Sequence, residues 1–298
     1  MWDNLLHSIQ NGNFKHLARA ISLTENEVDG YEEFLIGLPS NAKQIIGITG
    51  PPGAGKSTLV DALISHIISN KQTVAILCID PSSPFNLGAL LGDRIRMNQW
   101  YNNPNVYIRS LATRGSLGGL HPKILEITDV LKQAPFDYII IETVGVGQSE
   151  IEIAGLADTT IVTLVPEAGD EVQTMKAGLM EIADIFVINK ADRPEANLFE
   201  KNLKSMLAPA FNKQKEIPIL KTTASQNVGV NVLFDSIKKH QLNNHKSNKY
   251  YYLLAQKAYH LIKQSRMKSV SKAELLQKIT SQASDSTFNI YNFIKQFT

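Results

Sequence analysis

One stretch of nine residues, from Gly50 to Thr58, constrains the fold of this chain more than any other feature. It reads Gly-Pro-Pro-Gly-Ala-Gly-Lys-Ser-Thr, which is the Gly-x-x-x-x-Gly-Lys-Ser/Thr pattern of a phosphate-binding P-loop. The apolar run 45–49 precedes the motif, and the helix-forming stretch 59–68 follows it. Because a P-loop connects a buried strand to a helix, this order predicts a nucleotide-binding α/β domain.

The residue types in the motif suit a bound polyphosphate. Gly50, Gly53 and Gly55 permit a sharp loop whose backbone N–H groups turn inward, and the next helix adds the positive end of its dipole. We expect Lys56 to reach the β and γ phosphates and the hydroxyl of Ser57 to hold Mg²⁺. The predicted phosphate-binding residues are Gly50, Pro51, Pro52, Gly53, Ala54, Gly55, Lys56, Ser57 and Thr58.

Short β-branched runs recur along the chain and alternate with helical stretches. The predicted strands span residues 45–49, 74–79, 106–110, 138–141, 160–165, 185–189 and 218–222. Continuous apolar runs suit strands that are buried on both faces, and helices between them suit a parallel sheet. The predicted fold is therefore an α/β P-loop NTPase with a mainly parallel sheet flanked by helices.

Helical patterns extend beyond this core at both ends of the chain. In the N-terminal region, Ser22 with Glu25 is a candidate capping box at a helix start. The polar stretch 241–249 reads as a linker, and Ser271 with Glu274 could cap a helix beyond it. The C-terminal helices would either pack on the core or form an oligomerisation arm. We favour the arm, because three amphipathic segments would otherwise expose much apolar surface.

These patterns predict three parts of the chain. They are an N-terminal helical extension (1–42), a nucleotide-binding domain (43–240), and a linker with a C-terminal helical arm that forms a dimer (241–298).

Composition excludes several classes of function. The chain has 298 residues and a formal net charge of only +2. Because it lacks the large positive charge typical of nucleic-acid-binding proteins, we expect no nucleic-acid partner. Cys78 is the only cysteine and lies in an apolar run, which predicts a buried strand residue rather than a disulfide. The N-terminus lacks a secretory signal pattern, and no apolar run is long enough to span a bilayer. We therefore expect a cytoplasmic protein without a membrane partner.

A second motif indicates which base is bound. The sequence Asn-Lys-Ala-Asp at 189–192 follows the apolar run 185–188 and matches the Asn-Lys-x-Asp element with which GTPases read guanine. The carboxylate of Asp192 can accept hydrogen bonds from the guanine N1–H and exocyclic amine, while Lys190 would lay its stem over the base. Such a site discriminates by roughly 10⁴-fold against a base without those donors. The predicted ligands are therefore GTP and GDP.

The guanine site is expected to include a second loop, which follows the predicted strand 218–222 and would contact the base oxygen through a backbone N–H. The predicted guanine-binding residues are Asn189, Lys190, Asp192, Thr222, Thr223 and Ala224.

Carboxylates at the ends of two predicted strands suit a magnesium site. Asp80 follows the strand 74–79 and Glu142 follows the strand 138–141, so both should lie beside the P-loop at the carboxyl edge of the sheet. Mg²⁺ bound to a nucleotide prefers oxygen ligands and keeps several waters. We expect Ser57, Asp80, Asp93 and Glu142 to bind it directly or through water.

The spacing of residues in the sequence identifies the groups that would sense or drive hydrolysis less closely than it identifies the P-loop. The backbone N–H of Gly145 is a candidate contact to the γ phosphate, which would let it sense hydrolysis. Gln148 is a candidate for positioning the attacking water, beside Lys56, Asp93 and Glu142 in the catalytic set. The cation that neutralises the transferring phosphoryl group stays open among Arg94, Arg96, Arg109 and Arg114.

Several longer segments of the sequence are more specific than these general GTPase motifs. They span residues 17–26, 80–83, 91–97, 112–120, 142–150 and 166–176. Together, over about residues 15 to 230, they look like the MeaB/ArgK family of P-loop GTPases, to which the human methylmalonic aciduria type A protein belongs.

The resemblance implies a homodimeric GTPase with a low intrinsic rate that a partner stimulates. The implied partner is adenosylcobalamin-dependent methylmalonyl-CoA mutase, or a related cobalamin-dependent mutase, whose cofactor loading, protection and reactivation it would control as a chaperone. Asp170 and Lys176 match a third switch that reports the nucleotide state to the partner, and Lys176 is also a candidate member of the catalytic set. By the family pattern, the residues around Mg²⁺ and the phosphates are Lys56, Ser57, Asp80, Asp93 and Glu142.

Other functions stay open from the sequence. One is a chaperone of another acyl-CoA mutase, and another is a metal-insertion GTPase of the nickel type. The latter class usually exposes Cys and His ligands, whereas this chain has one Cys and seven scattered His. An ATPase or kinase for lysine, arginine and ornithine transport, as the family is described in older usage, disagrees with the guanine-reading Asp192.

Overall fold

The computed structural model describes residues 2–80, 97–113, 120–143, 153–168, 182–207, 217–243, 248–267, 269–282 and 288–297. The chain divides into two compact units, Met1–Tyr250 and Tyr251–Thr298. Each unit is described by itself.

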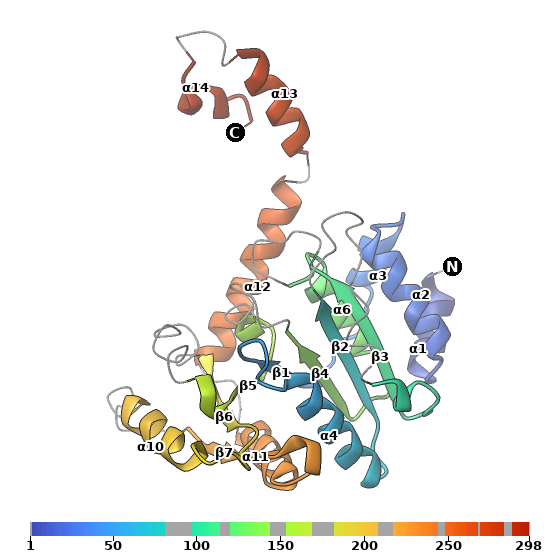
Figure 1. Cartoon of the computed structure of the whole chain (residues 1–298). Coiled ribbons are helices and arrows are strands. Elements are labelled where there is room, and N and C mark those ends of the chain that lie inside the picture. The colour runs from blue at the N-terminus through green and yellow to red at the C-terminus, as the bar shows by residue number, and fades with distance from the viewer. Residues whose placement is uncertain are drawn as a thin grey trace. The chain divides into compact units, whose positions relative to one another are not determined.

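A seven-stranded sheet forms the centre of the first unit, in the order β3-β2-β4-β1-β5-β6-β7 (Figure 1). Every neighbouring pair of strands is parallel. The strands are β1 (Ile45–Thr49), β2 (Val74–Asp80), β3 (Val106–Ala112), β4 (Tyr138–Glu142), β5 (Thr159–Leu164), β6 (Ile185–Ile188) and β7 (Ile219–Lys221). All seven predicted strands are present, because apolar β-branched runs mark parallel strands buried on both faces. The predicted α/β fold is confirmed.

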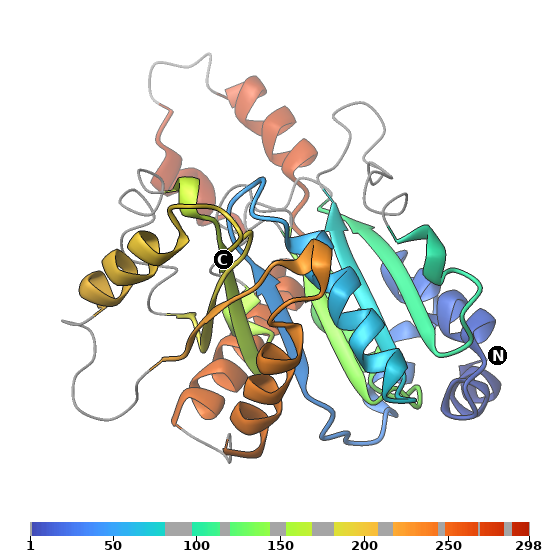
Figure 2. The same ribbon diagram turned by 60° about the horizontal axis from the view of Figure 1, so that its bottom comes forward.

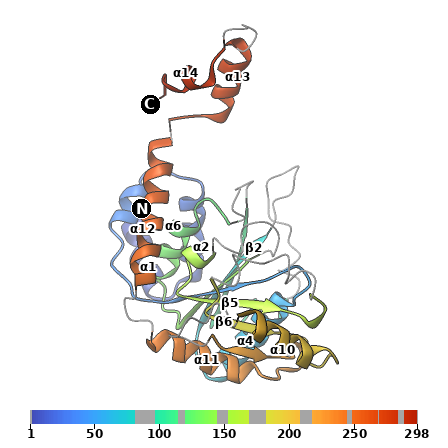
Figure 3. The same ribbon diagram turned by 90° about the vertical axis from the view of Figure 1, so that its left-hand side faces the viewer.

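Helices cover both faces of this sheet. On one face lie α4 (Lys56–Ser69) and α11 (Val230–Asn243), and on the other lie α6 (Ile124–Leu131) and the N-terminal helices (Figure 3). Figure 2 shows α4 and α11 in front of the sheet, where Leu63 and Phe234 enter one buried core. α10 (Ala196–Leu207) packs on β5 and β6 through Phe199 and Leu203. Cys78 is 1% exposed on β2, which confirms the prediction of a buried strand residue.

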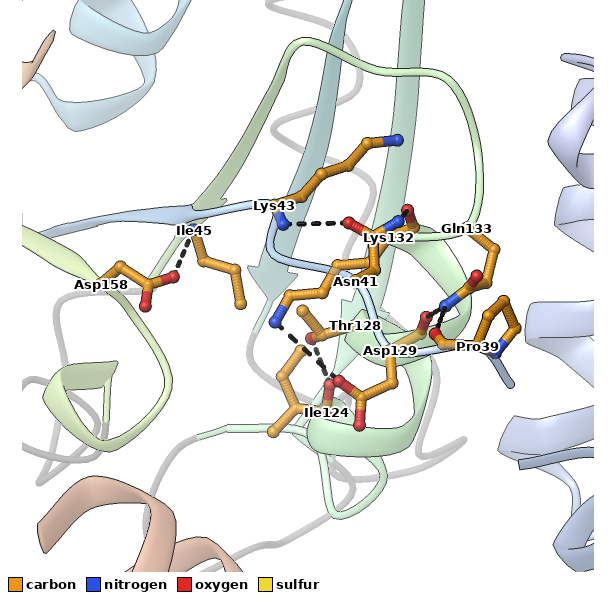
Figure 4. A network of polar contacts seen from close by, with 10 residues as sticks. All are labelled: Pro39, Asn41, Lys43, Ile45, Ile124, Thr128, Asp129, Lys132, Gln133 and Asp158. Atoms are coloured by element: carbon orange, nitrogen blue, oxygen red, sulfur yellow. Dashed lines mark hydrogen bonds and ion pairs between the residues drawn. The ribbon is translucent and has the colours of Figure 1, made fainter. Parts of the chain in front are cut away.

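Close contacts fix β1, the strand that leads into the P-loop. The backbone N–H of Ile45 donates to Asp158 Oδ2 at 2.7 Å (Figure 4). In the middle of the strand, Gly47 allows the short 3-10 helix η2 (Ile153–Gly155) to approach, since a Cβ there would lie 2.7 Å from Ile153 Cγ1. The sequence of β1 is therefore constrained by packing as well as by its motif.

Three helices precede the sheet: α1 (Trp2–Gln10), α2 (Phe14–Glu25) and α3 (Tyr31–Ile36). The candidate capping box at Ser22 and Glu25 is wrong, because both residues lie in the last turn of α2. The N-cap is Asn13, whose Oδ1 accepts from the backbone N–H of His16 at 3.1 Å. Asn is as good an N-cap as Ser, and the apolar spacing of α2 continues past Ser22 without a break.

Charged side chains hold α2 to β3 and to the start of α6. Arg109 Nη2 on β3 lies 3.0 Å from Glu25 Oε2, and His121 Nε2 lies 3.5 Å from Glu25 Oε1. The hydrogen bond to His121 and the charge of Arg109 lower the pKa of Glu25 to about 2, although burial opposes this shift. Lys123, which pairs with Glu27 at 2.6 Å, extends the network. The N-terminal helices are thereby attached to the sheet unit.

The segment 37–44 connects α3 to β1 without forming a helix or strand, and hydrogen bonds to the end of α6 fix it. Asn41 Nδ2 donates to the carbonyl oxygen of Lys132 at 2.7 Å (Figure 4). Gln133 Nε2 donates to the carbonyl oxygen of Pro39 at 3.2 Å. The connection into the P-loop strand is therefore held by hydrogen bonds to Lys132 and Gln133, just after α6.

The second unit contains most of α12 (Asn248–Met267), then α13 (Lys272–Gln282) and α14 (Ile290–Ile294). The predicted linker 241–249 is shorter than expected, since α11 extends to Asn243 and α12 begins at Asn248. Ser271 Oγ lies 3.5 Å from the backbone N–H nitrogen of Glu274, as expected for a cap of α13. In the described parts of both units, no helix has the length and apolar character needed to cross a membrane.

Aromatic rings form a small cluster in the second unit, with centroids of Phe288 and Phe297 at 5.8 and 5.3 Å from that of Phe293. Many other large apolar side chains there are exposed. They are Tyr251, Tyr259, Ile262, Met267, Leu276, Ile290, Tyr291 and Ile294.

Candidate functional site

The predicted site residues meet at one edge of the sheet. In a parallel sheet all strands end at the same edge, which is where ligands of α/β proteins bind. The P-loop follows β1 at the centre of the strand order. Asp80 and Glu142 end β2 and β4 on one side of it, while Asn189 follows β6 on the other. The order of the strands thus places the carboxylates and the guanine motif on opposite sides of the P-loop.

Two glycines of the P-loop occupy positions that no other residue can. Gly50 has φ +140°, and a Cβ at this position would lie 2.0 Å from the carbonyl oxygen of Thr163. Gly55 has φ +80°, and its Cβ would lie 2.5 Å from Asn189 Nδ2. The loop therefore lies too close to the backbone of β5 and to the side chain of Asn189 for a Cβ atom, which explains the two glycines physically.

The two functional side chains that begin α4 are buried and hydrogen bonded. Lys56 Nζ donates to the carbonyl oxygens of Gly50 at 2.9 Å and of Pro51 at 3.0 Å. Ser57 Oγ donates to Glu142 Oε1 at 2.7 Å. The ammonium group thus lies across the mouth of the loop, and the Ser57 hydroxyl joins the loop to a carboxylate of β4.

The described oxygen groups fit a magnesium site. Asp80 and Glu142 are 2% and 3% exposed, on strands that pair with each other. Glu142 is in register with Cys78, so Asp80 lies two positions further along β2. Mg²⁺ prefers such hard oxygen ligands, and Ser57, Asp80 and Glu142 would hold it. The fourth predicted ligand, Asp93, lies outside the described residues.

Asn189 joins the guanine motif to the P-loop. Its Oδ1 accepts from Thr222 Oγ1 at 3.1 Å and from the backbone N–H of Ala224 at 3.2 Å. Its Nδ2 donates to the carbonyl oxygens of Ala54 at 3.0 Å and of Gly55 at 3.4 Å. One buried amide therefore connects three segments that are far apart in the sequence, namely both guanine loops and the P-loop.

The remaining guanine residues lie around this amide. Lys190 has φ +55°, and its Nζ donates to the carbonyl oxygen of Gly53 at 2.8 Å, so its stem extends along the P-loop. Asp192 is exposed, and its Oδ1 accepts from Thr223 Oγ1 at 3.4 Å. The Asp192 carboxylate and the Lys190 side chain therefore both lie on the loop that Asn189 joins to the P-loop.

One candidate residue within the described part of the chain lies away from this site. Arg109, one of the candidate cations for hydrolysis, instead donates from Nη2 to Ser22 Oγ and Glu25 Oε2, each at 3.0 Å. Further candidate residues lie outside the described residues; they are Asp93, Arg94, Arg96, Arg114, Gly145, Gln148, Asp170 and Lys176.

The structure also shows an ion pair that the sequence analysis missed. Arg193, the residue after Asp192, pairs with Glu167 on the 3-10 helix η3 (Pro166–Ala168). The pair connects the guanine loop to the end of β5. No local sequence pattern predicts the contact between Arg193 and Glu167, because the two residues are far apart in the sequence.

A P-loop coupled through Asn189 to an Asn-Lys-x-Asp loop, on a seven-stranded parallel sheet, defines a P-loop GTPase. Comparison with known proteins gives the family. Residues 17–283 match the family model described as methylmalonyl-CoA mutase-associated GTPase MeaB. The chain belongs to the MeaB family. The match extends further toward the C-terminus than the resemblance read from the sequence, which covers residues up to about 230.

Individual relatives agree with this family. A GTPase of Pyrococcus abyssi is 48% identical over 250 residues, covering 81% of this chain and 76% of the relative. A fused isobutyryl-CoA mutase of Geobacillus kaustophilus is 35% identical over 256 residues, covering 78% of this chain but only 24% of that longer protein. A crystal structure of an LAO/AO transport system kinase shares the fold, with a TM-score of 0.64, 20% identity, and coverage of 99% of this chain and 96% of the other.

Proposed function

We propose that this chain binds GTP with Mg²⁺, hydrolyses it to GDP and phosphate, and uses the nucleotide state to control a cobalamin-dependent acyl-CoA mutase. The position of Asn189 carries the nucleotide part, because its amide joins Ala54 of the P-loop to both guanine loops. A P-loop and a guanine reader held together in this way would bind one nucleotide across its whole length.

The proposed binding mode assigns a task to each described group. Asp192 would accept from the guanine N1–H and amine, and Lys190 would cover the base. Lys56 would exchange the carbonyl oxygens of Gly50 and Pro51 for the β and γ phosphates. Gly145, which lies outside the described residues, would contact the γ phosphate as well. These contacts orient the γ phosphorus for in-line attack by water, which forms one P–O bond as the bond to the β phosphate oxygen breaks.

The metal belongs to the same proposal. Bound Mg²⁺ would neutralise charge on the β and γ phosphates. Ser57, Asp80, Glu142 and Asp93 would hold it directly or through water. Gln148 is the proposed residue for positioning the attacking water. The water gives up a proton to solvent, which completes the step.

Partner control is the more specific part of the proposal. The family is one of mutase-associated GTPases, and a relative is itself a fused isobutyryl-CoA mutase. We propose methylmalonyl-CoA mutase as the partner, with cofactor loading, protection and reactivation as the controlled events. Asp170 and Lys176 would report the nucleotide state to it. The fused relative also supports a second candidate, a mutase acting on isobutyryl-CoA.

The proposed assembly is a cytoplasmic homodimer that uses the C-terminal helices. The exposed apolar side chains of α12, α13 and α14 support this part, because a second copy would remove them from water. Sedimentation of the full chain and of a chain ending at residue 243 tests it. A full chain that sediments as a monomer would contradict it.

The partner is tested by measuring the affinity of the full chain for purified methylmalonyl-CoA mutase and for a purified mutase acting on isobutyryl-CoA. Each affinity is measured with a non-hydrolysable GTP analogue and again with GDP. We expect one mutase to bind with an affinity that differs at least about tenfold between the two nucleotides, since a switch needs about 1.4 kcal/mol or more of differential affinity. The same mutase should raise the rate of GTP hydrolysis. Equal binding in both nucleotide states, or no binding to either mutase, would contradict the proposed partnership.

A further inference from the structure

One carboxylate on α4 receives hydrogen bonds from a distant part of the chain. Asp61 Oδ1 accepts from Trp100 Nε1 at 2.6 Å. Gln99 Nε2 donates to the same carboxylate, at 2.9 Å from Oδ1 and 3.1 Å from Oδ2. Both donors lie on the 3-10 helix η1 (Asn98–Trp100), which follows Met97. A charged acceptor makes such hydrogen bonds stronger than those between neutral groups.

Apolar packing supports the same attachment. Met97 is fully buried in the core that contains Leu63 of α4, and the half-buried ring of Trp100 packs against that core. Residues 97–100 are therefore held on α4 by their side chains, through the core and through Asp61. The indole N–H is the polar part of this contact, and it fixes the orientation of the ring.

Asp61 is close in the helix to the residues that would bind the phosphates. It follows Ser57 by four positions on α4, so the two side chains lie on the same side of the helix, one turn apart. Ser57 in turn donates to Glu142. On the other side of the contact, Met97 follows Asp93 by four positions in the chain. The Asp61 contact therefore joins the phosphate helix to the chain that carries a proposed magnesium ligand.

We propose that Asp61 is a positioning residue for GTP hydrolysis, acting through Trp100. Its carboxylate holds η1 at a fixed place on α4, one turn after Ser57, and so fixes the point in the chain five positions after Asp93. This inference depends on the proposed function, because it assumes that Asp93 acts at the nucleotide. The Asp61 carboxylate is directed to Gln99 and Trp100, so its effect should fall on turnover rather than on nucleotide binding.

The chain offers a direct optical probe of this contact. It has two tryptophans, and Trp2 lies in the N-terminal helices, where its Nε1 donates to the carbonyl oxygen of Asp29 at 3.0 Å. A Trp2→Phe background therefore leaves Trp100 as the only indole. Its emission reports on the Asp61 contact in the full chain.

The test compares Asp61→Ala, Asp61→Asn and Trp100→Phe in the full chain with saturating Mg²⁺. We expect Asp61→Ala to lower kcat about tenfold while KM for GTP changes by less than about twofold. Asp61→Asn keeps one oxygen that can accept from Trp100 and should recover most of the rate. In the Trp2→Phe background, the emission maximum of Trp100 should shift in Asp61→Ala, which lacks the acceptor for the indole N–H, and return toward that of the unchanged contact in Asp61→Asn.

Trp100→Phe preserves the ring but removes the N–H donor. It should reproduce the loss of kcat, and combining it with Asp61→Ala should add little, because both changes break one contact. Asp235→Ala is the matched control, since Asp235 is an exposed carboxylate on α11 that pairs with Lys238 at 2.8 Å. It should leave kcat unchanged.

Two results would overturn the inference in distinguishable ways. Wild-type kcat in both Asp61→Ala and Trp100→Phe would contradict the role of Asp61 alone, and so would losses that add in full in the double variant. If Asp61→Ala fails to fold, Trp100→Phe decides the question, because it removes the N–H donor and keeps the ring. Failure of the unchanged chain to hydrolyse GTP would instead contradict the proposed function, and the role of Asp61 with it.

Discussion

The two sides of the P-loop are built from different kinds of contact. On the guanine side, Asn189 makes its hydrogen bonds to Ala54, Gly55, Thr222 and Ala224, none of which uses the carboxylate that would read the base. On the phosphate side, the groups that would bind the ligand are themselves engaged. Lys56 donates to loop carbonyls, and Ser57 donates to Glu142.

This difference separates recognition of the base, on the guanine side, from the response to the γ phosphate, on the phosphate side. A nucleotide can enter the guanine side without breaking the Asn189 contacts, and Asp192 would exchange only its 3.4 Å contact with Thr223, so most of the cost of ordering that side is already met within the folded chain. On the phosphate side, a ligand must replace existing hydrogen bonds. The γ phosphate can therefore change which groups Lys56 and Ser57 contact, whereas the base should change little. We expect mutations on the two sides to have different signatures.

The largest expected effect is on the phosphate side, from Lys56→Ala. Removing the ammonium group should lower the rate of GTP hydrolysis about 10³-fold, because one preorganised charge at a reacting phosphate contributes on this scale. The preference for GTP over ATP in binding should remain. Single-turnover hydrolysis and competition calorimetry measure the two quantities. Lys71→Ala, at an exposed lysine just beyond α4, is the control, and a loss of base preference in Lys56→Ala would break the comparison.

On the guanine side, Asn189→Ala should affect folding and binding together. It removes three buried hydrogen bonds of 3.0–3.2 Å. Each is worth about 1 kcal/mol, so we expect a loss of about 3 kcal/mol in the free energy of unfolding. Urea denaturation measures this loss, and GTP affinity should fall in parallel. Asn197→Ala, which removes an exposed contact to Lys221, is the matched control. Unchanged stability would show that Asn189 does not hold the loops together.

A smaller change on the same side should alter base preference alone. Asp192→Asn removes the charged acceptor for the guanine N1–H and amine, which should weaken GTP binding by roughly 10- to 100-fold at about 1.5–3 kcal/mol. ATP binding and thermal stability should stay the same, since Asp192 is exposed. Calorimetry with both nucleotides checks this. Thr223→Ala, which removes only the 3.4 Å contact to Asp192, should have little effect.

The smallest effect should come from Glu25, which serves neither side. Its folded-state pKa of about 2 is below the usual value of 4.5, so its contribution to stability is present above pH 4.5 and is lost as the pH falls toward 2. Glu25→Gln should therefore lower the free energy of unfolding by about 1–2 kcal/mol at pH 7, after allowance for solvent screening of a side chain that is 13% exposed. Urea denaturation from pH 7 to pH 3 should show the difference shrinking, while GTP binding at pH 7 is unchanged. A difference that does not depend on pH would contradict the ionic role of Glu25.

Local sequence patterns predicted the sheet because its strands are short apolar runs between helices. Val74 to Ile79 and Tyr138 to Ile141 are examples in which each residue type agrees with burial on both faces. The edge position of Asp80 and Glu142 followed from the parallel order, since it places every strand end on one side. The P-loop and guanine motif were found because their chemistry depends on fixed spacing.

Contacts between distant segments escaped the sequence. The candidate capping box at Ser22 and Glu25 failed because both residues lie at the end of α2, where Glu25 pairs instead with Arg109, 84 residues away. Asp61 and Trp100 are 39 residues apart, and neither has a neighbour in sequence that marks the pair. Such pairs depend on which helix covers which strand, and periodicity within one element contains no information about that.

The single thiol offers a way to follow the whole sheet without altering it. Cys78 lies in β2, between β3 and β4, with 1% of its surface exposed. A thiol reagent in solution can reach it only after the strands on either side separate, so the labelling rate of the unmodified chain measures how often the centre of the sheet opens. The rate of Cys78 labelling can therefore be measured in each variant above. Nucleotide should lower this rate wherever it binds the closed sheet more tightly than the open one.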